Sequence, residues 1–215
     1  MADNTSLVSR TIWARYGKRV FDVLISAGLL VILSPLLLLT IIMVKLTGPG
    51  PVFFSQVRAG KHGELFQLLK FRTMRADRTP DPKELIPLDH PDITPLGRAL
   101  RRLKIDESPQ LIHVLGGRMS LIGPRPTLPD QVEAYDDFRR QRLLVRPGIT
   151  GLAQISCGSD TQLGDVSRKL DYDIDYIKKR NLIVDIIILL STFKVVSTPN
   201  AENNSVRLKR FIKIS

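Results

Sequence analysis

An adjacent pair of carboxylates, Asp106 and Glu107, stands between a basic run and the predicted start of a helix. An ionised carboxylate can attack phosphorus and form an acyl phosphate. A second carboxylate can hold Mg²⁺, which neutralises phosphate charge. The cations Arg101, Arg102 and Lys104 are expected to keep Asp106 ionised. The alternative is a pair of capping acids that only balances a basic face, since acidic residues are common at helix starts.

Three further segments carry cations in settings suited to phosphate. Lys70 lies in the strand-like KFRTM segment, where a lysine supplies a point charge. Arg125 in GPRP and Arg146 in RPG are each flanked by turn-forming residues, and rigid flanks lower the entropy lost when an arginine is ordered. Binding of a diphosphate needs such preordered guanidinium groups. The alternatives are a charged strand edge for the first segment and two surface turns for the others.

Composition bounds the classes of partner. The chain has 215 residues and a formal net charge of +11, which favours an anionic partner such as phospholipid, nucleotide or nucleic acid. Nucleic acid is not predicted, because aromatic residues make up 6% of the chain and do not alternate with the basic runs. The single cysteine, Cys157, excludes an intrachain disulfide and a Cys-rich zinc site. No Walker or Rossmann glycine motif is present, so a nucleotide would be held by cations and a metal.

A charge-free run from Val23 to Val44 is long enough to span a bilayer, at roughly 33 Å if helical. Ser34-Pro35 stands at its middle, and a proline there removes a helix hydrogen bond. Both flanks are basic, whereas a crossing helix usually shows an asymmetry of positive charge. The sequence therefore predicts a re-entrant segment that turns at Ser34-Pro35 and returns to the same face. A kinked single-pass anchor is the alternative.

The remaining chain alternates short apolar segments with turns. Strands are predicted over 52–57, 65–69 and 152–156, a long loop over 79–95, helices over 96–103, 109–115, 128–144 and 165–179, an interfacial amphipathic helix over 182–196, and a basic tail over 207–213.

Six segments in a fixed order resemble one known family: PVFFSQVRAG, KFRTM, RRLKIDESPQL, MSLIGPRP, VRPGITGLAQ and LDYDIDYIKKRNLIVDI. The chain resembles, over about residues 16–197, the bacterial sugar transferases. These are monotopic phosphoglycosyl transferases, which begin glycan assembly on polyprenol phosphate. The length resembles the short form of the family. Each motif is weak alone, but six in this order are specific.

The resemblance implies a mainly helical α/β catalytic domain on a re-entrant membrane helix hairpin with interfacial amphipathic helices. It implies an N-terminal segment with the membrane helix over 1–46, a catalytic domain over 47–200 and a basic C-terminal tail over 201–215. It further implies a bacterial inner membrane protein in contact with membrane lipid, with its catalytic domain on the cytoplasmic face, and it allows a homodimeric assembly.

The resemblance also implies the reaction and the residues that perform it. A sugar 1-phosphate would move from a nucleoside diphosphate sugar, expected to be a UDP-sugar, to polyprenol phosphate through a covalent aspartyl phosphosugar, with release of UMP. The implied roles are the nucleophile Asp106, the Mg²⁺ ligand Glu107, the phosphate-contacting Arg101, Arg125 and Arg146, the nearby Lys70, and the helix-breaking pair Ser34 and Pro35. A membrane-tethered basic binding or scaffold module without turnover is the competing hypothesis, and it does not account for the carboxylate pair.

Overall fold

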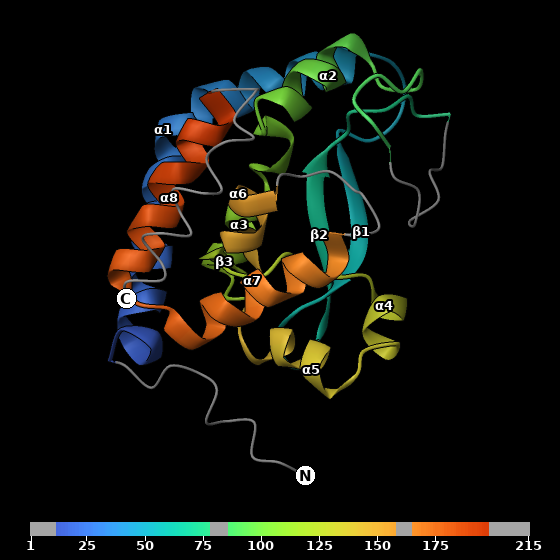
Figure 1. Cartoon of the computed structure of the whole chain (residues 1–215). Helices are drawn as coiled ribbons and strands as arrows, with labels where there is room; N and C mark the ends of the chain where they lie inside the picture. The colour runs from blue at the N-terminus through green and yellow to red at the C-terminus, as the bar shows by residue number, and fades with distance from the viewer. Residues whose placement is uncertain (1–11, 78–85, 158–164, 198–215) are drawn as a thin grey trace.

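The computed structural model describes residues 12–77, 86–157 and 165–197. Within these ranges, helices pack around two separate two-stranded sheets (Figure 1). The predicted basic tail and part of the predicted loop over 79–95 lie outside the described residues, as does the extreme N-terminus.

Helix α1 (Lys18–Leu46) follows a short π-helical turn, Trp13–Gly17. It buries polar side chains and exposes apolar ones. Its buried positions include Lys18, Asp22 and Ser26, whereas apolar side chains such as Val31 and Ile32 are 73% and 75% exposed. A helix in water would show the opposite pattern. Among the described residues, α1 is the one helix whose length and apolar composition suffice to cross a membrane.

The predicted break at Ser34-Pro35 is a bend within a continuous helix. Pro35 has no N–H to offer the carbonyl of Val31, and the Ser34 hydroxyl donates to that carbonyl at 2.8 Å instead. Figure 1 shows α1 rising along one side of the molecule and then bending across its top. The two separate arms expected from the sequence are therefore joined without a loop, because a side-chain donor replaces the lost backbone donor.

The first sheet is the predicted hairpin. Strands β1 (Phe53–Ala59) and β2 (Leu65–Phe71) pair antiparallel, from Phe53 opposite Phe71 to Ala59 opposite Leu65. The 3₁₀ turn Lys61–Gly63 connects them. This hairpin carries Lys70 near the end of β2, on the side where the next elements pack.

The segment after the hairpin brings two short helices together. Helix α2 (Pro95–Arg102) is followed by a 3₁₀ turn, Ile105–Glu107, and then by α3 (Gln110–Leu115). A Cβ atom on Gly97 would lie 2.0 Å from the Thr73 carbonyl oxygen, so only glycine allows α2 to approach the end of the hairpin this closely.

The second sheet joins two of the arginine motifs. Strands β3 (Ser120–Ile122) and β4 (Gly148–Thr150) are parallel, and the backbone of GPRP lies directly against that of RPG. A Cβ atom on Gly148 would lie 2.1 Å from the Gly123 nitrogen. Both glycines are therefore needed for the contact that fixes the backbone before Arg125.

Two expectations for the following region are wrong. The predicted helix over 128–144 is divided into α4 (Pro129–Glu133), α5 (Asp137–Arg140) and a 3₁₀ turn (Gln141–Leu144), because Asp136 begins a new helix by accepting from the Arg139 N–H at 2.8 Å. The predicted strand over 152–156 is helix α6 (Leu152–Cys157), since the strand pairing is already completed by β4.

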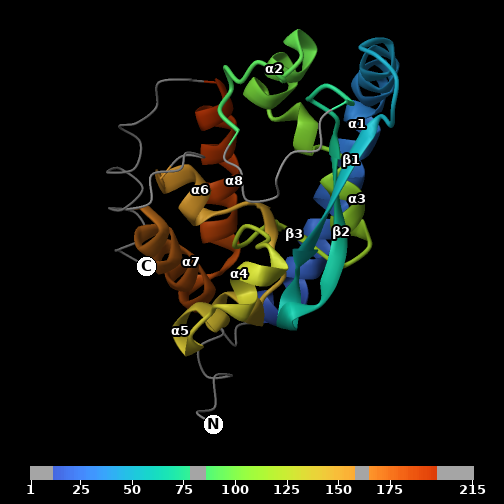
Figure 2. The ribbon, with the colours of Figure 1, turned by 90° about the vertical axis from the view of Figure 1, so that its right-hand side faces the viewer.

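The last two helices lie where the sequence predicted helices, and the interfacial position of the second stays a prediction. Helix α7 spans Asp165–Lys179 and α8 spans Leu182–Ser197. On α8, Asp185 is buried, and its Oδ2 accepts from Trp13 Nε1 at 2.9 Å and lies 3.5 Å from Lys18 Nζ. Helices α1 and α8 thus meet at their N-terminal ends and separate towards the other end (Figure 2).

The main core lies between these helices and the two sheets. Its fully buried members include Val114, Met119, Ile122, Ile177 and Ile188, with Tyr176 at the centre. The Tyr176 hydroxyl lies 3.0 Å from the Ile122 carbonyl oxygen and 2.8 Å from Asp185 Oδ1, so it joins β3 to α8.

Candidate active site

The carboxylate pair lies on the tight turn between α2 and α3. Lys104 has a left-handed backbone, with φ of 57°, and this conformation turns the chain into the Ile105–Glu107 segment. Asp106 and Glu107 are 7% and 9% exposed. Ser108, which precedes the predicted helix over 109–115, donates from its hydroxyl to the Ile105 carbonyl at 2.6 Å and closes this turn.

Glu107 is the centre of an ionic cluster. Its Oε1 accepts from Lys70 Nζ at 2.7 Å and from Arg125 Nη2 at 2.9 Å. Burial would raise the pKa of Glu107, but Arg125 and Lys70 together hold that pKa well below its usual range. Glu107 is therefore held as an anion by two cations, Lys70 on β2 and Arg125 in the loop after β3.

Lys70 and Arg125 differ in how much of each side chain meets solvent. The Lys70 side chain is 22% exposed, and burial lowers its pKa more than Glu107 raises it. The Arg125 side chain is 49% exposed, and Glu107 raises its pKa. Arg125 thus combines one fixed nitrogen with an open face that an incoming anion can reach.

Asp106 is in a different state from its neighbour. Its Oδ1 is buried and has no hydrogen-bond partner among the described residues. Burial, followed by the charge of Glu107, raises the pKa of Asp106, and Lys70, Lys104 and Arg101 oppose that rise without overcoming it. Desolvation therefore outweighs the cations in setting the direction of this shift, and the expectation that the basic run keeps Asp106 ionised stays a prediction.

Arg101 approaches the pair from α2. Its Nε donates to Thr73 Oγ1 at 2.9 Å, and its Nη1 donates to the Ile86 carbonyl at 3.3 Å. Burial lowers the pKa of Arg101, and the charges of Asp106 and Glu107 act in the opposite direction. The structure thus brings Arg101, Lys70 and Arg125 near the carboxylates, and their roles as phosphate contacts stay predictions.

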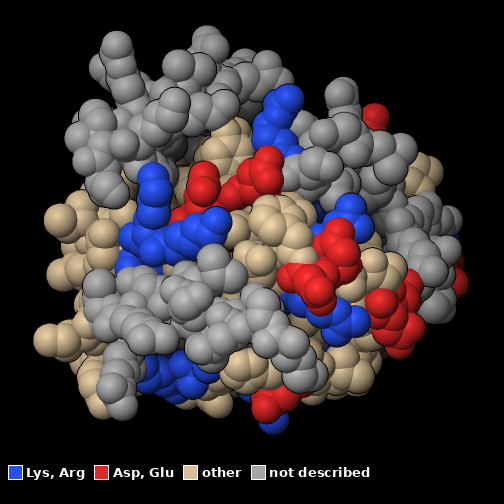
Figure 3. Space-filling view, turned by 60° about the horizontal axis from the view of Figure 1, so that its bottom comes forward, with Lys and Arg blue, Asp and Glu red and all other residues tan. Residues whose placement is uncertain are grey.

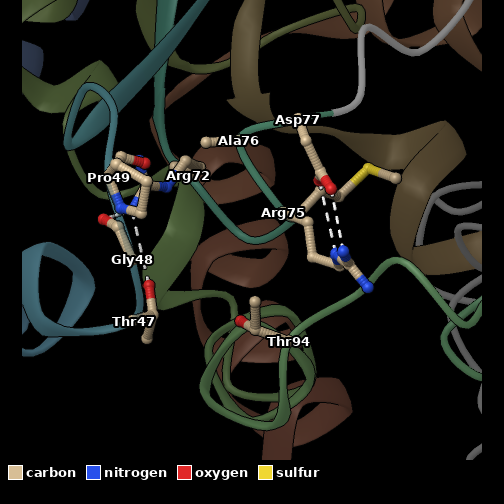
Figure 4. A pocket seen from close by; sticks show the side chains of 9 residues that line it. Thr47, Gly48, Pro49, Arg72, Arg75, Ala76, Asp77 and Thr94 are labelled. Atoms are coloured by element: carbon tan, nitrogen blue, oxygen red, sulfur yellow. Dashed lines mark hydrogen bonds and ion pairs between the residues drawn. The ribbon is translucent and has the colours of Figure 1, made fainter.

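The second cation of KFRTM has a structural role. Arg72 donates to the carbonyls of Val44 and Gly48, both at 3.0 Å, and so caps the C-terminal end of α1. Figure 4 shows Arg72 directed towards this turn, at one side of a cavity of about 220 Å³. On the other side, Arg75 and Asp77 form an exposed ion pair at 2.8 Å, separate from the Asp106–Glu107 cluster.

Sequence reasoning missed Arg58, on β1. Its Nη2 donates to Gln56 Oε1 at 2.6 Å and its Nη1 to the Pro126 carbonyl at 3.3 Å. Burial, and then the charge of Arg125, lower the pKa of Arg58 to about 10. Arg58 therefore holds the loop that carries Arg125. The only signal in the sequence was a cation inside an otherwise uncharged strand.

Arg146 is not brought into this cluster. Its Nε donates to the Gly117 carbonyl at 2.7 Å, and its side chain lines a second cavity of about 370 Å³. In the described part of the chain, no hydrogen bond or ion pair joins it to Asp106 or Glu107. The two arginine motifs are in contact through their backbones. The guanidinium group of Arg125 binds Glu107, whereas that of Arg146 lines the second cavity.

The cluster has the donors that Mg²⁺ requires if a substrate supplies phosphate oxygens. Within the described residues, no group of three or more His, Cys, Asp and Glu side chains forms a metal site. Mg²⁺, however, is commonly held by one or two carboxylates together with substrate phosphates. Asp106 Oδ1 lacks a hydrogen-bond partner, and the hydrogen bonds and ion pairs of Glu107 all fall on Oε1. The pair therefore fits such a shared site.

Charge on the surface is grouped by sign. Figure 3 presents the face at the lower end of the molecule in Figure 1, where Lys and Arg side chains form groups beside groups of Asp and Glu. Single-sign groups concentrate potential, so the basic ones attract anions from solution.

Comparison with known proteins gives a consistent result. Residues 13–199 match the family model described as bacterial sugar transferase. An uncharacterized sugar transferase, EpsL, of Bacillus subtilis (strain 168) is 40% identical over 196 residues, which cover 90% of this chain and 95% of that protein. The exopolysaccharide production protein ExoY of Sinorhizobium fredii is 36% identical, covering 83% of this chain and 84% of that protein.

Longer relatives are matched over part of their length. The undecaprenyl-phosphate galactose phosphotransferase of Salmonella typhimurium is 38% identical over 198 residues, which are 85% of this chain and 41% of that protein. The chain therefore spans less than half of this relative.

Proposed function

The chain belongs to the bacterial sugar transferase family, so it is a transferase, and we propose that it moves a sugar 1-phosphate from a nucleoside diphosphate sugar to polyprenol phosphate. Names of relatives support this proposal, since one is an undecaprenyl-phosphate galactose phosphotransferase and another a UDP-glucose:undecaprenyl-phosphate glucose-1-phosphate transferase. A UDP-sugar is the proposed donor, and UMP the proposed leaving product. The family's place in exopolysaccharide production, seen in the name of ExoY, fits a first membrane step of glycan assembly.

The observation that carries the proposal is the contrast between the two adjacent carboxylates. Glu107 is fixed by two cations, whereas Asp106 Oδ1 is buried without a hydrogen-bond partner. A carboxylate oxygen that is not engaged by a donor keeps its electron pairs for attack on an electrophile. We assign Asp106 as the nucleophile and Glu107 as the residue that orders its surroundings.

The proposed reaction has two displacements at phosphorus. In the first, an Asp106 oxygen attacks the sugar-linked phosphorus and the bond to the oxygen of the nucleoside phosphate breaks, which releases UMP and leaves an aspartyl phosphosugar. In the second, an oxygen of polyprenol phosphate attacks the same phosphorus and frees the Asp106 carboxylate. Each step exchanges one phosphorus–oxygen bond for another, so no oxidant or further reactant is needed.

Arg125, Arg101 and Lys70 would stabilise the negative charge that these displacements build on the phosphate oxygens. Arg125 is the strongest candidate for direct contact, because half of its side chain is exposed. Mg²⁺ held by Glu107 would supply charge neutralisation for the diphosphate. Replacing Arg125 by alanine should lower the rate by about 30- to 1000-fold, the cost of one lost charge-assisted contact of roughly 2–4 kcal/mol.

The covalent step can be tested by intact mass. The protein is incubated with Mg²⁺ and a panel of UDP-sugars, without polyprenol phosphate, and its mass is measured. A gain of one sugar phosphate is expected for the wild type and for the surface control Arg98→Gln, and no gain for Asp106→Asn. An adduct on Asp106→Asn would show that another residue is the nucleophile. Stoichiometric binding of every nucleotide sugar without adduct or UMP release would favour a binding module instead.

We further propose that α1 enters and leaves the membrane on the cytoplasmic face, with α8 at the interface. The bend at Pro35 and the apolar exposed face of α1 support this topology, and α8 also exposes Ile183 and Leu190, at 67% and 63%. A monotopic arrangement would keep the carboxylate pair near the lipid phosphate on the side where nucleotide sugars occur.

Impermeant thiol labelling of intact cells tests the topology. Single cysteines replace Thr5 or Ser55 in a Cys157→Ser background, and both should stay protected until the cells are opened. Labelling of the Thr5 position alone would establish a crossing helix. Replacing Ser34-Pro35 by Ala-Leu should straighten α1 and favour crossing, whereas an unchanged pattern would show that other contacts set the topology.

A further inference from the structure

A second cavity, of about 370 Å³, lies at the N-terminal end of α1 and is called here the basic cavity. Its walls come from five parts of the chain: the start of α1, the β1–β2 turn, β3, the segment before β4, and the end of α7. Five cationic side chains line it, namely Lys18, Arg19, Lys61, Arg146 and Arg180. The only carboxylate among its lining residues is Asp22, which already binds Lys18 Nζ at 2.9 Å.

Three of the five cations, Lys61, Arg146 and Arg180, have nitrogens without a hydrogen-bond acceptor among the described residues. Arg180 Nε is buried and has no hydrogen-bond partner in the described part of the chain. Arg146 uses Nε on the Gly117 carbonyl, and the described structure gives no acceptor to its two terminal nitrogens or to Lys61 Nζ. Arg19, by contrast, is satisfied by the carbonyls of Val114 and Leu115.

Like charges therefore face one another across this space. Burial lowers the pKa of Lys61, and Arg146 and Arg180 lower it further. Burial likewise lowers the pKa of Arg180, and the charge of Arg146 lowers it further, while Tyr176 and Asp185 act in the opposite direction. An unpaired buried donor is costly, and a bound anion would both satisfy it and relieve the repulsion.

We propose that the basic cavity binds a phosphate-bearing anion, held by Lys61, Arg146 and Arg180. Arginine grips phosphate with two parallel N–H groups and lysine adds a point charge, so three cations from three separate elements can surround one phosphate. A volume of about 370 Å³ accommodates that group with a substituent. The same chemistry is offered by a free phosphate compound and by a phospholipid headgroup.

This site is distinct from the Asp106–Glu107 cluster. The cations whose charges act on that pair are Lys70, Lys104, Arg101 and Arg125, and none of them lines the basic cavity. The proposal therefore does not rest on the proposed transferase mechanism, and loss of either can be observed without loss of the other.

The chain contains a local reporter for this cavity. Trp13 is its single tryptophan, and its indole donates to Asp185, which also lies 3.5 Å from the cavity residue Lys18. The next residue, Ala14, lines the cavity itself. Binding of an anion to these cations should change the environment of Trp13, and hence its fluorescence.

The experiment titrates the full chain, in maltoside micelles at constant ionic strength, with inorganic phosphate while Trp13 fluorescence is recorded. A saturable response is expected for the wild type and for Asp106→Asn. Arg180→Gln and Lys61→Gln should each weaken the apparent affinity at least tenfold. Arg98→Gln removes the same charge from the exposed surface of α2 and should leave the affinity unchanged. Thermal unfolding is measured for every variant to establish that it is folded. If one of the two cavity variants does not fold, the other still tests the proposal.

A second arm separates the two sources of phosphate by adding phosphatidylglycerol to the micelles. If a headgroup occupies the cavity, this lipid alone changes Trp13 fluorescence in the wild type, and phosphate then competes with it. If only soluble phosphate compounds bind, the lipid has no effect on the phosphate titration. The proposal is overturned if neither probe gives a saturable response, if the response survives unchanged in both cavity variants, or if Asp106→Asn abolishes it.

Discussion

Replacing Lys70 by methionine should destabilise the protein by about 2 kcal/mol at pH 7, because this lysine is one of two donors to a buried anion. Lys70 Nζ lies 2.7 Å from Glu107 Oε1, and the two side chains are 22% and 11% exposed, so solvent screens the contact little. Arg125 remains on the same oxygen at 2.9 Å. The cost should therefore stay below the roughly 3–5 kcal/mol typical of a buried charge that loses its partner entirely.

The assay is a double-mutant cycle of wild type, Lys70→Met, Glu107→Gln and the double variant. Thermal unfolding is followed through Trp13 fluorescence in micelles, and a loss of about 2 kcal/mol should lower the midpoint by roughly 4–8 °C for a chain of this size. Arg98→Met, which removes a charge from the exposed surface of α2, is the matched control and should change stability by less than about 0.5 kcal/mol.

The cycle also identifies the origin of the effect. If the contact with Glu107 is responsible, Lys70→Met should cost much less when Glu107 is already glutamine, because the charge that Lys70 satisfies is then absent. An equal cost in both backgrounds would refute the reasoning, since the contribution of Lys70 would then come from packing of its methylene chain.

Three further variants test other parts of the structure. Gly148→Ala places a Cβ atom 2.1 Å from the Gly123 nitrogen and should cost about 1–3 kcal/mol in thermal unfolding while reducing adduct formation. Asp173, paired with Arg142, has a pKa raised by burial to about 6, so its stabilising contribution is full below about pH 4 and is lost as pH rises through 6; Asp173→Asn should flatten that part of a stability–pH curve. Tyr176→Phe leaves a buried acceptor without its donor and should cost about 1–3 kcal/mol in chemical unfolding.

Local elements were predictable where a short-range cause fixes them. The hairpin follows from two apolar segments around a glycine turn, and α7 and α8 follow from periodicity and length. The grouping of Lys70, Arg101 and Arg125 around the carboxylates was predicted only through the order of the motifs. No local property of those three segments indicates that they meet.

The features of the site and fold that the sequence did not predict arise from tertiary contacts. Burial decides that Asp106 has a raised pKa, and burial is not visible in a run of neighbouring cations. Arg146 lies just before β4 and next to the Arg125 loop, yet its side chain is directed to the basic cavity by the carbonyl of Gly117. The helical state of 152–157 depends on β4 ending at Thr150, which a propensity argument does not detect.

The contact of Trp13 and Lys18 with Asp185 makes the start of α1 part of the folded catalytic region. The first turns of α1 complete the polar interior of the catalytic part, so a version cut after Leu46 would leave Asp185 without two of its donors. The anchor is thus a component of the fold and cannot serve as an exchangeable tether. The family match begins at residue 13 and so includes these first turns. Chimaeras made for expression should place their junction ahead of Trp13.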